Sequence, residues 1–152
     1  MNLTRFTDYS LRILIFLAIQ PEPRLSNIQE ISALYRISNN HLMKAVHELG
    51  KLGLLQTVRG RNGGIRLAQA PEAINIGYVV RQTEENWHVV ECFDEENGFC
   101  VISPLCRLKG VLQEALAAYL QVLDRYTLAD LVANRQGLSN LLLPNGPRPA
   151  DA

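Results

Sequence analysis

The chain of 152 residues has little cysteine, and all of it stands in one segment. Cys92, Cys100 and Cys106 lie within a stretch of fifteen residues, and no CxxC pair occurs. An odd number of thiols argues against a disulfide framework, and the missing CxxC pairs argue against the tight knuckles of structural zinc sites. The three thiols therefore look like an incomplete set of metal ligands, whose fourth member lies elsewhere.

The sequence also lacks an apolar run of the roughly 20 residues that a membrane-spanning helix needs. The N-terminal stretch is apolar, but Arg5, Asp8 and Arg12 interrupt it and no small-residue cleavage site follows Gln20. It is more typical of an amphipathic helix than of a signal peptide. We expect a cytoplasmic protein without membrane contact, and in that reducing compartment clustered cysteines more often bind metal or exchange electrons than form crosslinks.

Neither sign of charge dominates the whole chain, but its two halves differ. Residues 1–70 carry nine basic and four acidic side chains, a net charge of +5, and the remainder carries six and eleven, a net charge of −5. This asymmetry suggests an N-terminal half that faces a polyanion. No nucleophile–base pair or phosphate-binding motif is visible and the three histidines are scattered, so an enzyme is the least favoured class.

The N-terminal half has the pattern of a helix-turn-helix. Apolar spacing predicts a first helix over about Thr7–Gln20, which two following prolines end. Ser26 and Gln29 have the form of a capping box that opens a second helix through about Tyr35, and Ser38 is the candidate N-cap of a third helix. A short helix, a tight turn and a longer helix with a polar first turn are typical of DNA-binding proteins.

A β-hairpin is expected directly after the third helix. Leu54–Arg59 and Ile65–Ala68 are predicted strands on either side of a basic, glycine-rich turn, as in the wing of a winged helix. An ordinary surface hairpin would have similar turn glycines, but its place after a helix-turn-helix favours contact with a DNA backbone or minor groove. The third helix can offer asparagines to adenine and further polar groups to bases or phosphates. The predicted DNA contacts are Ser38, Asn39, Asn40, His41, Lys44, Arg59, Arg61, Asn62, Gly63 and Arg66.

A long helix is expected to follow the cysteines. The apolar series from Leu108 to Tyr126 keeps helical spacing for about five turns, and its stripe is wide enough for a dimer contact. A helix lying on its own subunit fits the periodicity almost as well, but DNA readers of this type commonly pair two half-sites, which favours a homodimer. A short helix over Ile74–Glu85 should pack under the wing, and Thr127 should cap a short final helix.

The spacing of the cysteines leaves their chemistry open. Seven residues separate Cys92 from Cys100 and five separate Cys100 from Cys106. Thiolates suit zinc, copper(I) and iron-sulfur clusters, and the wide spacing favours the bulkier cluster. Three unrelated thiols, or a thiol-disulfide switch, are the alternatives.

Residues 1 to about 143 resemble the NsrR/IscR-type winged-helix iron-sulfur transcription regulators. The resemblance is carried by FTDYSLRIL, SNNHLMK, VRGRNGGIRLA, the three-cysteine loop ending in CRLK, and YTLADLV. It is closest to the branch of the nitric-oxide-sensing repressor NsrR. Members like IscR have a histidine ligand three residues after the last cysteine, where this chain has Lys109. NsrR-like members have an acidic residue early in the first helix, which maps to Asp8.

The resemblance implies a mainly α fold with a small β-hairpin, divided into three parts. These are a winged helix-turn-helix domain at 1–75, a cluster-binding loop with dimerisation helices at 76–143, and a flexible tail at 144–152. It further implies that Asp8 of one subunit completes the cluster held by Cys92, Cys100 and Cys106 of the other. A 4Fe-4S cluster is favoured and a 2Fe-2S cluster is possible. The family commonly has five residues between the first two cysteines, so the seven found here leave the loop geometry open.

The function implied is a homodimeric repressor that binds double-stranded DNA at a palindromic operator and responds to nitric oxide through its cluster. A related regulator sensing iron supply, oxygen or oxidants is the first alternative. An iron-sulfur electron carrier or cluster-transfer protein is the second, and for it the basic N-terminal half would be incidental.

Overall fold

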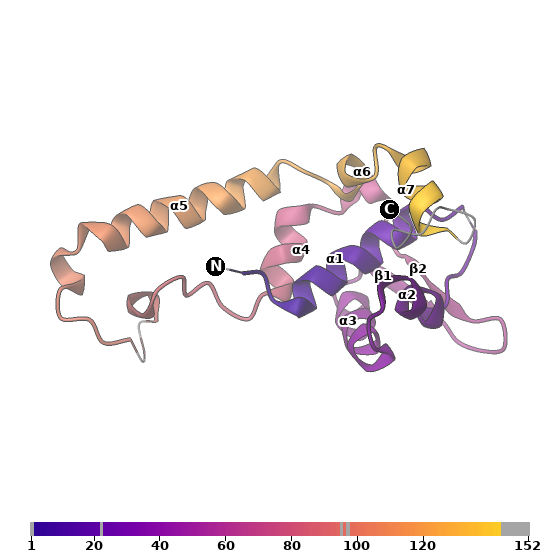
Figure 1. Ribbon diagram of the computed structural model, residues 1–152, viewed down its shortest axis with the longest axis horizontal. Coiled ribbons are helices and arrows are strands. Elements are labelled where there is room, and N and C mark those ends of the chain that lie inside the picture. The colour runs from indigo at the N-terminus through magenta and orange to yellow at the C-terminus, as the bar shows by residue number, and fades with distance from the viewer. Residues whose placement is uncertain (1, 22, 95, 97, 144–152) are drawn as a thin grey trace.

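A computed structural model describes residues 2–21, 23–94, 96 and 98–143 (Figure 1). The order of elements is three helices, a two-stranded antiparallel hairpin and four further helices, with short 3-10 turns between them. The predicted fold class, mainly α with one hairpin, is therefore confirmed. The tail expected at 144–152 lies outside the described residues.

Helix α1 (Arg5–Ala18) is the central element of the N-terminal half. It begins two residues before the predicted start because the side chain of Thr4 accepts a hydrogen bond from the backbone N–H of Thr7, at 3.3 Å. Its buried face includes Ile13 and Leu14, which are fully enclosed by the other elements. The helix packs against α3, α4, α6 and the second strand, so it links the DNA-binding half to the C-terminal half.

Helices α2 (Ile28–Tyr35) and α3 (Asn39–Lys51) form the helix-turn-helix. Ser38 caps α3 as predicted, but the capping box expected at Ser26 is wrong. Asn27 caps α2 instead, because its side-chain oxygen accepts the N–H of Gln29 at 2.9 Å. Ser26 is buried and its extended backbone exchanges two hydrogen bonds with Ile65 of the hairpin, at 2.9 and 3.0 Å.

The wing consists of β1 (Leu55–Val58), which is shorter than predicted, and β2 (Gly64–Leu67), which begins and ends one residue earlier than predicted. Their register runs from the pair Leu55 and Leu67 to the pair Val58 and Gly64. Leu55 and Ile65 are buried and fix the hairpin to the core. The tip projects away from the helices (Figure 1).

Helix α4 (Ile76–Thr83) packs mainly against α1 and α5, where we had expected a helix under the wing. Its buried positions, among them Val79 and Val80, complete the core around α1. Thr127 caps α6 (Leu128–Leu131) in a reciprocal capping box with Asp130. Helix α7 (Arg135–Leu142) follows and has no counterpart in the predictions.

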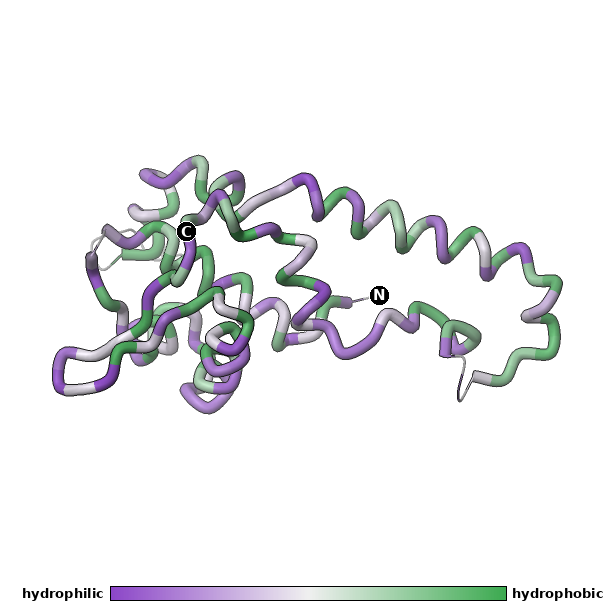
Figure 2. The backbone as a smooth tube through the Cα atoms, turned by 180° about the vertical axis from the view of Figure 1, so that it is seen from behind, coloured by the Kyte–Doolittle hydropathy of each residue, from purple (hydrophilic) through white to green (hydrophobic). Residues whose placement is uncertain are grey.

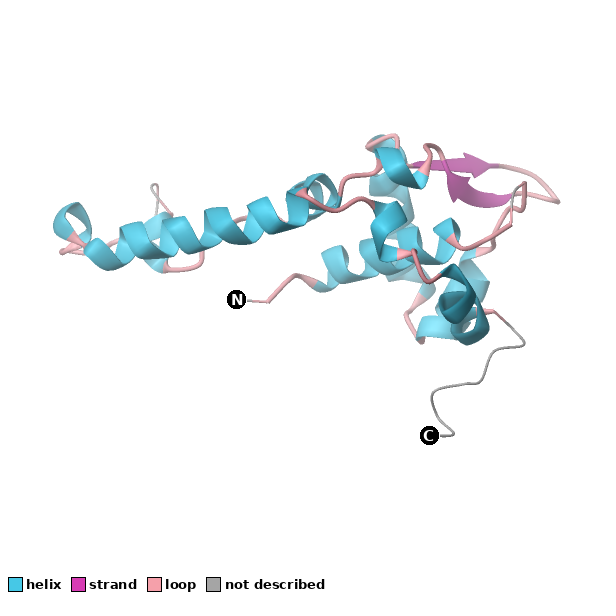
Figure 3. Ribbon diagram, turned by 90° about the horizontal axis from the view of Figure 1, so that it is seen from above, coloured by secondary structure: helices cyan, strands magenta, loops and turns pink. Residues whose placement is uncertain are grey.

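Helix α5 (Arg107–Asp124) leaves the body of the molecule and none of its residues is buried. It runs beside the segment that precedes it, and the two together form a long arm (Figures 1 and 3). The base of the arm is fixed, because Asn75 donates to the carbonyl of Asp124 at 2.7 Å and Arg81 pairs with the Asp124 carboxylate at 2.8 Å. Across the part of the chain that is described, no helix combines the length and apolarity needed to cross a membrane.

Candidate functional site

The first turn of α3 is exposed and polar, as a recognition helix requires. Asn39 and Asn40 are exposed to solvent, whereas the Ser38 hydroxyl is used as the helix cap and accepts from the N–H of His41 at 3.4 Å. His41 and Lys44 also contact α1. The His41 ring lies 6.0 Å from that of Tyr9, measured between centroids. The remaining predicted reader of this helix, Lys44, has its ammonium 5.6 Å from the centre of the Phe6 ring.

The wing carries the second group of predicted DNA contacts. Arg59, Arg61 and Asn62 are exposed at the tip. Gly63 shapes the turn, because a Cβ on it would lie 2.3 Å from the carbonyl oxygen of Val58. Arg66 is also exposed, and its Nε donates to the side chain of Gln56 across the hairpin at 2.9 Å. The basic groups of the wing are thus held on a hairpin whose own turn needs glycine.

Asp8, the proposed fourth ligand, lies in the first turns of α1 and bonds to Arg12 in this single subunit. Its two carboxylate oxygens accept from Arg12 at 2.9 and 2.8 Å, and both side chains are more than 40% exposed. The Arg12 guanidinium lies 5.7 Å from the centre of the Tyr35 ring. Burial raises the pKa of Tyr35 although the nearby Arg12 opposes the shift, so this phenol stays protonated at neutral pH.

The structure does not bring the four predicted ligands together within one subunit. Among the described residues no group of three or more His, Cys, Asp or Glu side chains is arranged to hold a metal. The segment with the cysteines lies along the arm, away from most of α1 (Figures 1 and 3). Cys92 lies in a 3-10 turn, Cys100 in a loop and Cys106 directly before α5, and all three are free, half-buried thiols.

The interval between Cys92 and Cys100 is folded back on itself. The N–H of Gly98 donates to the carbonyl of Asp94 at 2.9 Å, and the N–H of Phe99 donates to the Glu91 carboxylate at 3.4 Å. The second of these bonds joins the immediate neighbours of the two cysteines. The seven-residue gap therefore does not require the two thiols to be far apart.

Gly98 is needed for this closure. A Cβ placed on it would lie 2.2 Å from the carbonyl oxygen of Glu91 and 2.4 Å from that of Asp94, far inside contact distance. The sequence alone predicted only an exposed turn between Cys92 and Cys100. Three acidic residues followed by asparagine and glycine indicated a turn, but nothing in the sequence showed that the turn approaches Glu91.

A second link that the sequence did not reveal joins the start of α1 to the end of α4. The backbone N–H and the hydroxyl of Thr4 both donate to one oxygen of Glu84, at 2.8 and 3.1 Å. Tyr119 of α5 lies close by, since burial and the Glu84 carboxylate raise the pKa of its phenol. The beginning of α1 is thus tied to the residue from which the cysteine segment departs.

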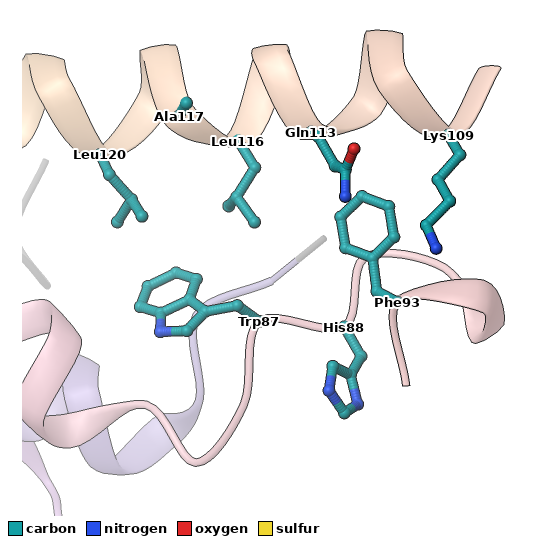
Figure 4. A pocket seen from close by; sticks show the side chains of 8 residues that line it. All are labelled: Trp87, His88, Phe93, Lys109, Gln113, Leu116, Ala117 and Leu120. Carbon is teal, nitrogen blue, oxygen red and sulfur yellow. The ribbon is translucent and has the colours of Figure 1, made fainter. Parts of the chain in front are cut away.

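A groove of about 350 Å³ lies between the cysteine segment and α5. Figure 4 shows Trp87 and Phe93 of the segment on one side and Leu116 and Leu120 of α5 on the other. Lys109, which occupies the position of the histidine ligand in IscR-like members, also lines this groove.

The outer end of the arm is unusually apolar for a surface. Val101 is 80% exposed and Leu105 is 92% exposed, and Phe99, Ile102, Leu108 and Val111 are also exposed. Figure 2 shows the corresponding apolar stretch at the far end of the arm. Exposed apolar patches of this kind mark interaction surfaces.

Three free thiols in one folded loop match the sulfur donors that iron-sulfur clusters use. The helix-turn-helix, the basic wing and the exposed start of α3 define a DNA-binding protein of the winged-helix class.

The chain belongs to the Rrf2 family, described as iron-dependent transcriptional regulators, whose model matches residues 3–134. It is 61% identical over 142 residues to the HTH-type transcriptional regulator NsrR of Shouchella clausii (strain KSM-K16), covering 93% of this chain and 95% of the relative. It is 59% identical over 142 residues to the NsrR of Bacillus subtilis (strain 168), covering 93% and 97%. The protein is therefore a transcriptional regulator, and the expectation that it is not an enzyme is confirmed by its relatives.

Two solved structures share the fold. The global cysteine regulator CymR (YrzC) of B. subtilis is 27% identical, with a TM-score of 0.71 over 88% of this chain and 98% of that one. The IscR of T. potens is 25% identical, with a TM-score of 0.68 over 88% of each chain.

Proposed function

We propose that the protein is a homodimeric transcriptional repressor whose affinity for a palindromic operator depends on an iron-sulfur cluster. Cys92, Cys100 and Cys106 of one subunit would hold the cluster together with Asp8 of the other. Residues 1–75 would read the DNA, and residues 76–143 would carry the cluster loop and the dimer contact.

The observation that carries this proposal is the position of Asp8 on α1. Phe6 and Tyr9, on either side of Asp8 in sequence, contact the recognition helix through Lys44 and His41. A helix transmits displacement along its length because each turn is hydrogen-bonded to the next. A force that moves Asp8 therefore acts on the helix that reads DNA.

The arm supplies the reason for a dimer. Helix α5 has 18 residues and none of them is buried. Packing within its own subunit therefore covers too little apolar surface to explain its apolar side chains. Pairing with a second copy would bury Leu108, Val111 and their apolar neighbours and would bring two DNA-reading domains together. Two half-sites one helical turn apart would then be read together.

The residues that would hold the cluster also suit a sensor. A bound cluster would supply iron that nitric oxide can attack, and an oxygen ligand such as Asp8 binds iron less firmly than thiolate does. The half-buried thiols leave access for a small molecule. The NsrR-like sequence favours nitric oxide as the signal and 4Fe-4S over 2Fe-2S as the cluster.

Anaerobic isolation followed by absorbance and Mössbauer spectroscopy tests the cofactor, and DNA binding before and after stoichiometric nitric oxide tests the signal. We expect Asp8→Asn to leave the fold of the apo-protein intact and to shorten cluster lifetime. Glu30→Gln is a matched control, because Glu30 forms an exposed ion pair with Arg24 much as Asp8 does with Arg12. An iron-free wild-type protein with full operator affinity would refute the proposal, whereas equal cluster lifetimes in both variants would remove only Asp8 from the ligand set.

A sensor of iron supply is the second candidate, because the family is described as iron-dependent. In that case operator affinity would follow cluster occupancy as iron is withdrawn, and stoichiometric nitric oxide would have no separate effect. Comparing iron chelation, oxygen and nitric oxide on one cluster-loaded sample distinguishes these signals.

A further inference from the structure

Arg36, in the turn of the helix-turn-helix, has an unfavourable backbone conformation. It follows α2 with φ 53° and ψ 40°, the left-handed region, and it is the one non-glycine residue with positive φ in the described part of the chain. Glycine is the usual residue at this position because it has no Cβ to clash with the backbone. An arginine that remains there despite the strain calls for an explanation in its side chain.

The side chain of Arg36 is exposed and, within the described residues, has no hydrogen bond, ion pair or ring contact. Several other basic groups of the N-terminal half are already engaged, with Arg12 on Asp8, Arg24 on Glu30 and Lys51 on Glu48. Arg59 and Arg61 of the wing are also without such contacts, as is Arg5. Arg36 thus resembles two of the three arginines that the sequence assigns to DNA, whereas the third, Arg66, is bonded to Gln56.

The backbone around Arg36 is fixed. The N–H groups of Arg36 and Ile37 both donate to the carbonyl of Ser32, and the Ser32 hydroxyl donates back to the carbonyl of Ile37 at 2.7 Å. Ile37 is buried, and Ser38 then caps the recognition helix. The Cα of Arg36 is therefore held at a constant position just before the end of α3 that enters the major groove in this class of protein.

A structural explanation competes with a functional one. A cation after the last turn of α2 interacts favourably with the negative end of the helix dipole. That interaction is available to any basic residue near the end of the helix, including one with an unstrained backbone. It does not explain why the positively charged residue occupies the left-handed position.

We propose that Arg36 binds a backbone phosphate of the operator, beside the recognition helix, and that its guanidinium adds affinity without reading sequence. This inference rests on the proposed DNA-binding dimer. Guanidinium groups bind phosphate bidentately, and a rigid turn spares part of the entropy lost on binding.

Salt dependence provides the test. Each phosphate contact contributes about −0.9 to the slope of log affinity against log salt, so one contact per subunit contributes about −1.8 per dimer. Raising the salt from 50 to 200 mM weakens DNA binding by every variant. This fold loss of affinity should be about 12 times smaller for Arg36→Gly than for wild type. The probe is a 30-base-pair duplex selected by the anaerobically isolated full chain from a random pool, with a scrambled duplex beside it.

The variants separate phosphate binding from a role in stability. Arg36→Gly should melt at or above the wild-type temperature, weaken binding to both duplexes equally and keep their affinity ratio, while Arg36→Lys should retain most of the salt slope. Arg24→Gly removes the same charge from an ion-paired site and should leave the slope unchanged. An Arg36→Gly protein with wild-type affinity and slope would overturn the proposal, and so would one that melts lower with unchanged binding, as the dipole explanation predicts. Wild-type protein that binds neither duplex would instead refute the proposed function itself, and this role with it.

Discussion

Replacing Gly98 with alanine should weaken cluster binding without unfolding the protein. The added Cβ would lie 2.2 Å from the Glu91 carbonyl oxygen and 2.4 Å from that of Asp94, and both are backbone atoms that cannot swing aside. The closed turn between Cys92 and Cys100 would have to open, and the hydrogen bond from Gly98 to Asp94 would be lost or strained.

The size of the effect follows from the strain. Forcing an extra methyl group into a packed position costs about 1–3 kcal/mol. If the closed loop is the form that binds the cluster, a penalty of about 1.4 kcal/mol reduces apparent affinity roughly tenfold, and the full range corresponds to about 5- to 160-fold. The loop lies outside the buried core, so the melting temperature of the apo-protein should change little.

Gly110→Ala is the matched control, since its Cβ on α5 would meet nothing within 4 Å. Removing glycine from a helix interior stabilises by about 0.5–1 kcal/mol, so this variant should bind the cluster normally and melt no lower than wild type. Both variants would be reconstituted anaerobically and compared by iron and sulfide content and by the rate of cluster loss to a chelator. Equal content and equal rates for Gly98→Ala and wild type would show that loop closure does not position the thiols.

Two further perturbations test the packing at the base of the arm and the capping of α6. Gly77→Ala should destabilise the fold by about 1–3 kcal/mol, because its Cβ would collide with the Asp124 carboxylate and backbone nitrogen at the base of α5. A denaturant titration measures this change. An unchanged midpoint would show that the arm is not fixed there. Asp130 caps α6 through the N–H and hydroxyl of Thr127, and these bonds lower the pKa of its carboxyl below the ordinary value of 3.8. Its contribution to stability is therefore complete above pH 3.8 and is lost as pH falls through the lowered pKa. Asp130→Asn should melt below wild type at pH 7, and the difference should shrink as pH falls below 3.8. A difference that stays constant as the pH is lowered would contradict the capping role.

The helix-turn-helix could be predicted because its determinants are local. Ser38 caps α3 from the adjacent residue, and the apolar spacing of α3 and α5 follows helical periodicity whatever lies around them. The expected cap at Ser26 failed because Asn27 supplies the same chemistry one residue later. Only the tertiary pairing of Ser26 with Ile65, distant in sequence, excludes Ser26 from the helix start.

The geometry of the candidate site depended on contacts that a sequence does not display. The approach of Gly98 to Glu91, the bond from Thr4 to Glu84 and the strain at Arg36 each require a folded backbone. The packing of α4 on α1 and α5 likewise depends on how the arm leaves the body. Residue types and their spacing could identify the thiols and the arginines as candidate site residues. They could not show how the loop closes or which arginine has a strained backbone.

The ion pair between Asp8 and Arg12 indicates how ligation can act as a switch. An exposed pair of this kind contributes only about 0.2–1 kcal/mol, which is small beside a metal–ligand bond, so a cluster can take Asp8 from Arg12. If Asp8 is a ligand, loss of the cluster would let its carboxylate return to Arg12. Because Arg12 also lies over Tyr35 of α2, the two proposed states would differ in the contacts between α1 and the helix-turn-helix. A ligand shifts a conformational equilibrium only through such differences, and here they would fall on the helix that contacts His41 and Lys44.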